Sequence, residues 1–126
     1  MGDLTTNFSR AEFTCPCGCG FDTINSSLVR MLQEIRDKVG MIEITSGFRC
    51  KTHNSEIGGV EKSAHMRGQA VDIKVHGSQH RFHLLKSAID SGFTRIGIGQ
   101  GFLHLDIDTT KPSHVAFDYY SKDHVA

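Results

Sequence analysis

The spacing of apolar residues predicts two amphipathic helices. In residues 26 to about 39, apolar side chains recur at helical spacing, and Gly40 follows as the expected end. A second helix is predicted over residues 78 to about 91, ended by Gly92. The inward side of the first helix is expected to carry Leu28, Met31, Leu32, Ile35 and Val39, and that of the second Phe82, Leu85, Ala88 and Ile89.

Alternation of apolar and polar residues predicts four strands, at residues 42–46, 69–75, 94–98 and 102–108. A Gly-Gln-Gly turn at 99–101 joins the last two as a hairpin, and residues 114–119 are expected to add an edge strand. Asp72 and His104 each lie opposite the apolar face of their strand, and Asp106 shares the face of His104. We therefore expect an α+β fold, a mostly antiparallel sheet with helices on one face and a polar cleft on the other.

Length and charge narrow the class of protein. The 126 residues suit a single domain spanning 1–126. Fourteen basic and fourteen acidic residues give no net charge, which argues against a nucleic-acid partner. The longest apolar runs are too short for a membrane span, and residues 1–5 do not resemble a secretory signal, so synthesis in the cytoplasm is expected. Residues 47–62 have no strong period and are expected to form a long loop.

One decapeptide carries the strongest chemical signal. Residues 63–72 have the form S-x-H-x-x-G-x-A-x-D, with His65 just before a predicted strand and Asp72 within it. Gly68 permits the bend that turns the imidazole toward the carboxylate. With His104 from the neighbouring strand, the set is two imidazoles and one carboxylate, a common catalytic zinc site that leaves one position for water. On spacing alone, a hydrogen-bonded histidine and a solvated aspartate remain the alternative.

At this decapeptide the chain resembles the zinc D-Ala-D-Ala carboxypeptidase and L-alanyl-D-glutamate endopeptidase family, which shares a metal-binding fold with the amino-terminal domain of hedgehog proteins. Residues 45–49 (TSGFR) and 102–106 (FLHLD) are also similar to the family, in its short single-domain branch from phages and bacteria. The resemblance implies that His65, Asp72 and His104 bind one catalytic zinc ion. It also implies that the protein hydrolyses peptide bonds in the stem peptides of peptidoglycan. The protein would reach the cell wall after release from the cell or as part of a phage particle.

The resemblance also implies roles around the metal. Arg49 is expected beside the cleft, where its guanidinium holds a substrate carboxylate, the alternative being a solvated loop arginine. Ser63 is expected to brace the loop or to bond the substrate, the alternative being an ordinary turn serine. Gln69 is expected to polarise the substrate carbonyl or to remain an exposed amide at the strand edge.

The general base is where this chain departs from the family. Many members carry an acid three positions before the last ligand, and others a histidine two before it, whereas this chain has Gly101 and Phe102 there. Asp106 is the best substitute as a base, and its alternatives are to orient a ligand histidine or to face solvent. The missing base leaves a second hypothesis open, a non-catalytic zinc-containing module that binds peptidoglycan or builds a virion.

Four cysteines, Cys15, Cys17, Cys19 and Cys50, have no role in that site. Without a secretion signal their expected state is the reduced thiol. The Cys-x-Cys-x-Cys spacing is tighter than the usual gap between zinc ligands, which favours free thiols, or one pair that bridges on oxidation, over a closed structural Cys₄ zinc site. Such a site would join the amino-terminal loop to the segment after Arg49.

Overall fold

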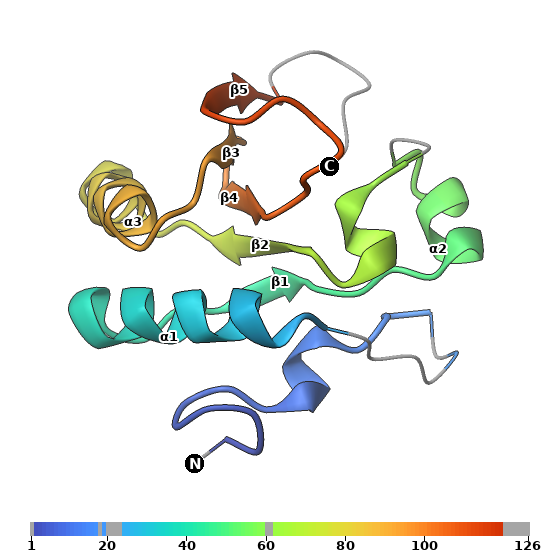
Figure 1. The fold of residues 1–126 in the computed structure, drawn as a ribbon, viewed down its shortest axis with the longest axis horizontal. Coiled ribbons are helices and arrows are strands. Elements are labelled where there is room, and N and C mark those ends of the chain that lie inside the picture. Colours follow the sequence, from blue (N-terminus) through green and yellow to red (C-terminus); the bar gives the residue numbers. More distant parts are fainter. Residues whose placement is uncertain (1, 18, 20–23, 60–61, 120–126) are drawn as a thin grey trace.

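A computed structural model describes residues 2–17, 19, 24–59 and 62–119 (Figure 1). Within these residues the chain forms two short 3₁₀ helices, η1 (Arg10–Phe13) and η2 (Ala64–Arg67). The α-helices are α1 (Ser26–Val39), α2 (Lys51–Glu56) and α3 (Ser78–Asp90). The strands are β1 (Ile44–Ser46), β2 (Ala70–Lys74), β3 (Arg95–Ile98), β4 (Phe102–Asp106) and β5 (Val115–Asp118).

The five strands form one sheet in the order β1-β2-β4-β3-β5. Every neighbouring pair is antiparallel except β3 and β5, which run parallel. This confirms the predicted α+β fold with a mostly antiparallel sheet, and β5 is the predicted edge strand. The hairpin between β3 and β4 is also confirmed, since Gly99 N–H donates to the Phe102 carbonyl. Because β4 lies in the centre, its side chains are enclosed on both faces, and the site residues of β2 and β4 become neighbours.

Helices α1 and α3 pack on one face of the sheet. Asn25 caps the start of α1, because its side-chain oxygen accepts from the backbone N–H groups of Ser27 and Leu28, and Gly40, whose φ of 97° suits glycine, caps its end. Its apolar stripe is confirmed, and burial of each large aliphatic side chain stabilises the fold by about 1.5–3 kcal/mol. The core joins the helices to the sheet through Leu28, Val29, Leu32, Ile35, Val71, Ile73, Leu84, Leu103 and Leu105.

The predicted inward face of α3 is wrong at two positions. Phe82 and Ile89 are 61% and 62% exposed, whereas Leu84 and Ala88 are fully buried. Both faces of this helix carry apolar residues, so the period did not distinguish them. Contacts outside the helix decide which face turns inward, because Arg81 donates two hydrogen bonds to carbonyl groups of the β3–β4 turn. These bonds hold the helix with Leu84 toward the core.

The predicted loop over residues 47–62 contains a short helix that the sequence pattern missed. Helix α2 has six residues and no apolar period, and the Cys50 sulfur caps it by accepting from His53 N–H at 3.4 Å. In Figure 1, α2 and α3 lie at opposite ends of the sheet.

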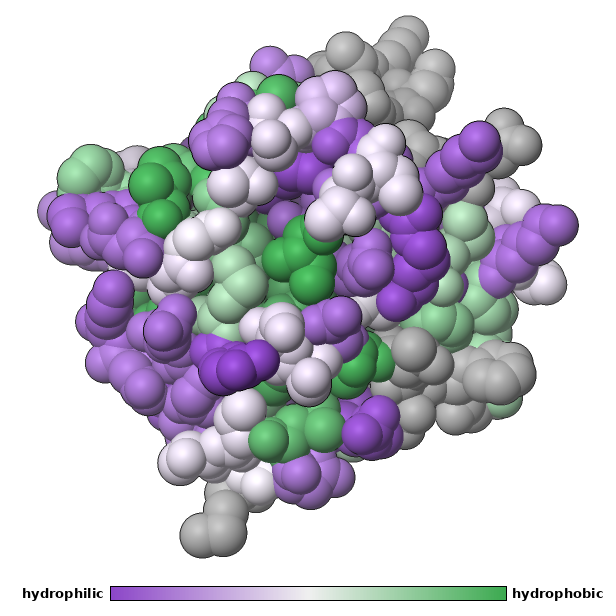
Figure 2. Space-filling view, viewed as in Figure 1, coloured by the Kyte–Doolittle hydropathy of each residue, from purple (hydrophilic) through white to green (hydrophobic). Residues whose placement is uncertain are grey.

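The face of the molecule seen in Figure 2 shows small mixed patches. In Figure 2 hydrophilic and hydrophobic residues are interspersed over the visible face, without a wide hydrophobic area. In the described part of the chain, no helix combines the length and the apolar character that crossing a membrane requires.

Candidate functional site

The turn that carries His65 is built by its neighbours in the sequence. Ser63 caps η2, and its hydroxyl oxygen accepts from His65 N–H at 3.2 Å. Gly68 ends η2 in the left-handed conformation, with φ of 67°, and so makes the bend predicted for it. The His65 ring is fully buried, and its Nδ1 lies 2.7 Å from the Gly47 carbonyl oxygen. Since a carbonyl only accepts, Nδ1 carries the proton and Nε2 keeps its lone pair.

Asp72 and His104 meet because they are directly opposite in register on β2 and β4. Asp72 Oδ1 lies 2.9 Å from His104 Nδ1 and 3.4 Å from His65 Nε2. One ligand atom from each of the three side chains lies within 4.8 Å of the others. The structure therefore brings together the three residues that the sequence singled out, from η2 and two separate strands.

This polar face is more enclosed than the open face expected from the sequence. The His65 and His104 residues are 0% and 4% exposed, and Asp72 keeps 13% of its side-chain surface. Burial lowers the pKa of His65 and keeps this ring neutral. Burial raises the pKa of Asp72, but the adjacent His104 and His65 lower it by more. The pKa of this carboxyl therefore lies well below its usual range, and the group is ionised.

A divalent metal ion fits these donors. The buried Nε2 of His65 has no hydrogen-bond partner among the residues that the structure describes, and an unpaired buried nitrogen is costly. It points its lone pair to the place where an ionised carboxylate and a second imidazole also lie. Neutral imidazole and carboxylate are the ligands of catalytic zinc sites with three protein donors.

Asp106 contacts the far side of the His104 ring. Its Oδ2 lies 2.7 Å from His104 Nε2, while its Oδ1 accepts from Arg95 Nε at 2.8 Å and from Asp108 N–H at 3.1 Å. Asp106 is 2% exposed, so the interpretation that it faces solvent is wrong. Burial raises the pKa of Asp106, but the hydrogen bond and charge of His104, the Asp108 N–H and the charge of Arg95 together lower it by more. Burial lowers the pKa of His104, yet the hydrogen bonds and the negative charges of Asp106 and Asp72 together raise it by more.

Sequence reasoning missed Arg95, which is directly opposite Asp106 in register between β3 and β4. A signal was present, since a hairpin joined by a short turn places Arg95 across from Asp106 once its register is set. The Arg95 side chain is 10% exposed, and its guanidinium also stacks on Phe117, 5.4 Å from the ring centre. Arg95 thus holds the carboxylate that holds His104.

The sequence analysis also missed two aromatic rings, one in β5 and one directly after it. Phe117 and Tyr119 lie with their ring centres 5.9 and 6.0 Å from that of His104. Gly97 makes room for them, because a Cβ there would stand 2.5 Å from the Tyr119 ring and 2.6 Å from the Phe117 ring. Burial raises the pKa of Tyr119, so its hydroxyl stays protonated. The parallel pairing of β5 with β3, a long-range contact, brings these rings to the site.

Arg49 is buried beside the His65 turn. The residue is 1% exposed, its backbone N–H donates to the His65 carbonyl at 3.1 Å, and Nη1 donates to Asn54 Oδ1 at 3.0 Å. The interpretation as a solvated loop arginine is therefore wrong. Burial lowers the pKa of Arg49, although the charge of Asp72 opposes this.

Gln69 is half-buried directly before β2, and its backbone N–H donates to the Ala64 carbonyl at 3.0 Å.

Comparison with known proteins finds the same family as the resemblance. The family described as Peptidase M15 matches residues 6–108, which include the three candidate ligands. A zinc D-Ala-D-Ala carboxypeptidase from Streptomyces albus G is 41% identical over 81 residues, covering 61% of this chain and 31% of that protein. The matched part of this chain thus spans less than a third of the length of that relative.

Proposed function

Because the chain belongs to the peptidase M15 family, we propose that it is a zinc metallopeptidase that hydrolyses peptide bonds in the stem peptides of bacterial peptidoglycan. The observation that carries the proposal is the convergence of His65 Nε2, an ionised Asp72 and His104, with one ligand atom of each within 4.8 Å of the others. The relative from Streptomyces albus G, a zinc D-Ala-D-Ala carboxypeptidase, supports the substrate class. The cell wall is then the place of action, reached by release from the cell or within a phage particle.

His65, Asp72 and His104 would hold the metal. When bound, zinc supplies a Lewis acid that polarises the peptide carbonyl and activates water for attack. The chain prepares its donors in advance, since the Gly47 carbonyl selects the tautomer of His65 and burial keeps that ring neutral. Asp72, the most exposed of the three, marks the side from which substrate approaches.

Asp106 acts through His104 in this proposal rather than as the general base. Its carboxylate accepts from His104 Nε2, so Nδ1, which lies 2.9 Å from Asp72 Oδ1, is the nitrogen that would bind the metal in place of that contact. Its other oxygen already accepts from Arg95 Nε and from a backbone N–H. Ser63 is likewise a positioning residue, because its hydroxyl holds the backbone of His65. Polarisation of the substrate carbonyl by Gln69 stays a prediction.

Arg49 is proposed to hold the carboxylate of the substrate. Its Nε is buried without a hydrogen-bond partner in the described part of the chain, and Asn54 fixes the guanidinium through Nη1. A guanidinium that is buried and already oriented binds a carboxylate with little loss of side-chain freedom.

Arg49→Lys keeps the charge and removes the planar fork. We expect kcat/KM to fall about tenfold to a hundredfold, mostly through KM, with zinc content unchanged. A larger KM effect in His83→Ala, on the exposed side of α3, would contradict this assignment.

Mass spectrometry of muropeptides incubated with the zinc-loaded protein tests the function. Loss of a terminal alanine identifies a D,D-carboxypeptidase, and cleavage between L-alanine and D-glutamate identifies the endopeptidase. His104→Ala should lose hydrolysis and the zinc ion of this site while its helices stay folded, whereas the matched control His83→Ala should keep both. Binding of muropeptides without any water-added product would instead favour the non-catalytic module.

A further inference from the structure

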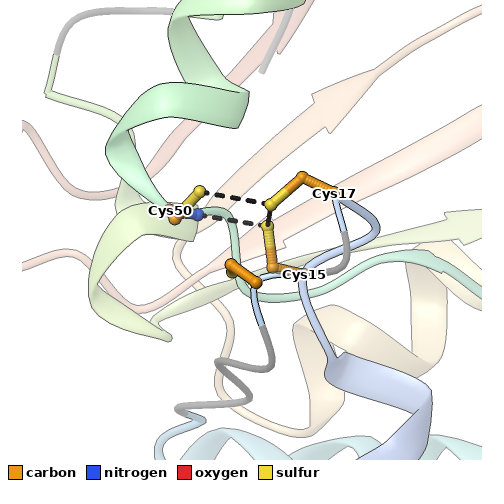
Figure 3. Close-up of side chains that lie close together, drawn as sticks. Cys15, Cys17 and Cys50 are labelled. Atoms are coloured by element: carbon orange, nitrogen blue, oxygen red, sulfur yellow. Dashed lines mark hydrogen bonds between the residues drawn. The ribbon is translucent and has the colours of Figure 1, made fainter.

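Four cysteine sulfurs gather at a second place, formed by the segment after η1 and the start of α2. The Sγ atoms of Cys15, Cys17, Cys19 and Cys50 all lie within 4.8 Å of one another. Figure 3 shows the Cys15, Cys17 and Cys50 side chains pointing toward one another. Cys50 is 31 positions or more along the chain from the other three, so the fold, not the local sequence, assembles the group.

The distances between sulfurs suit a shared metal ion better than a disulfide. Cys17 Sγ lies 3.4 Å from Cys15 Sγ and 3.5 Å from Cys50 Sγ. A disulfide requires about 2.05 Å, and the structure has all four cysteines as free thiols. Four sulfurs held tetrahedrally about 2.3 Å from a zinc ion are about 3.8 Å apart. The tight spacing of Cys15, Cys17 and Cys19 is therefore no obstacle, because their side chains already converge.

Backbone donors also face these sulfurs. Cys50 N–H donates to Cys15 Sγ at 3.4 Å, and His53 N–H donates to Cys50 Sγ at 3.4 Å. Hydrogen bonds to sulfur stabilise thiolates, and such supporting donors commonly orient the ligands of a metal site. Cys15 is buried, whereas Cys17 and Cys19 are exposed, so the group has one side in the protein and one open to an incoming ion.

We propose that Cys15, Cys17, Cys19 and Cys50 bind a second zinc ion with a purely structural role. Four protein ligands close the coordination shell and leave no position for substrate. The ion would join the segment around residues 15–19 to the first residue before α2. Arg49 directly precedes Cys50, so the same link would fix the backbone of the proposed substrate-binding arginine.

Metal analysis of the reduced protein, purified without chelator, tests this site separately from the catalytic one. We expect two zinc ions per chain in the native sequence, one in His104→Ala and one in Cys17→Ala/Cys19→Ala. The double cysteine variant changes exposed residues only and so avoids the buried Cys15. Ser26→Ala/Ser27→Ala, a pair of exposed residues a few positions further along the sequence, is the matched control and should keep two.

Cobalt substitution provides a readout that does not depend on activity. Sulfur-to-cobalt charge-transfer absorption should persist in His104→Ala and vanish in Cys17→Ala/Cys19→Ala. The proposal is overturned if the native protein binds one zinc ion while all four thiols react freely with a thiol reagent. A disulfide among these cysteines in the freshly purified protein would overturn it as well. Failure here leaves the zinc of His104 untouched, so the two proposals fail independently.

Discussion

Replacing Asp106 by asparagine separates a positioning role from a role as general base. The substitution preserves shape and leaves a carbonyl oxygen to accept from Arg95 Nε, which lies 2.8 Å from Oδ1. It places an amide N–H₂ where Oδ2 now lies 2.7 Å from His104 Nε2. Because an amide N–H₂ donates only, His104 must then accept at Nε2 and carry its proton at Nδ1, on the side of Asp72. That tautomer opposes metal binding by the same nitrogen.

The expected magnitude follows from these contacts. Loss of a carboxylate that orients a ligand histidine typically weakens metal binding by about 10- to 100-fold, or about 1.4–2.7 kcal/mol. The protein also loses the negative charge beside Arg95, which is only 10% exposed. Arg95 keeps its contacts with the Pro112 carbonyl and the Phe117 ring. We therefore expect the free energy of unfolding to fall by about 1–3 kcal/mol rather than by the full cost of an unpaired buried charge.

Competition with a chromophoric chelator measures the zinc affinity of Asp106→Asn, and muropeptide hydrolysis at saturating zinc measures its turnover. In the positioning role, the affinity falls and much of the turnover returns when the site is filled. Asp90→Asn is the matched control, because Asp90 is exposed on α3 and pairs only with Lys86 among the contacts found in the structure.

The reasoning is refuted by the opposite pattern. If Asp106→Asn binds zinc as tightly as the native protein yet loses turnover about 100-fold or more at saturating zinc, Asp106 acts on the reacting groups directly. That result would return it to the role of general base that the sequence suggested.

Other predictions test the packing and the charges around the site. Leu84→Ala should lower the unfolding free energy by about 2–5 kcal/mol in urea denaturation, and Phe82→Ala by about 0.5 kcal/mol or less, since only Leu84 is buried. Gly97→Ala should lower the melting temperature, at a cost of about 1–3 kcal/mol, because its Cβ would press on Tyr119; an unchanged melting temperature would contradict that contact. Burial raises the pKa of Asp108, but its hydrogen bonds and cationic neighbours lower it by more, so the folded state holds the proton less tightly than the unfolded state. Stability should then fall as the pH drops below about 4, less steeply in Asp108→Asn; equal slopes in urea titrations of both proteins would refute this.

Local patterns were enough to predict much of the fold. The apolar stripe of α1 and its end at Gly40 are properties of one helix, and alternation in β2 and β4 placed Asp72 and His104 on one face. The same patterns failed on α3, where both Leu84 and Phe82 fit an apolar stripe. They also missed α2, since six residues are too few to show a period.

The candidate metal ligands could be named from sequence because a motif and a strand pattern pointed to the same chemistry. The roles of the residues around these ligands could not be predicted from sequence. Whether Asp106 faces solvent or His104 depends on Arg95, which reaches it from the neighbouring strand. The enclosure of His104 by Tyr119 depends on a parallel pairing of β5 with β3.

The amino-acid order alone specifies which residues are able to bind a metal and which face of each strand is apolar, because these properties depend on residue type and on periods of two or about four. Contacts between distant segments specify the rest: the rotation of α3, the neighbours of His104 and the gathering of Cys50 with Cys15. Such contacts form only when burial of the common core outweighs the entropy lost in closing the long loops between them. No short stretch of sequence contains that balance.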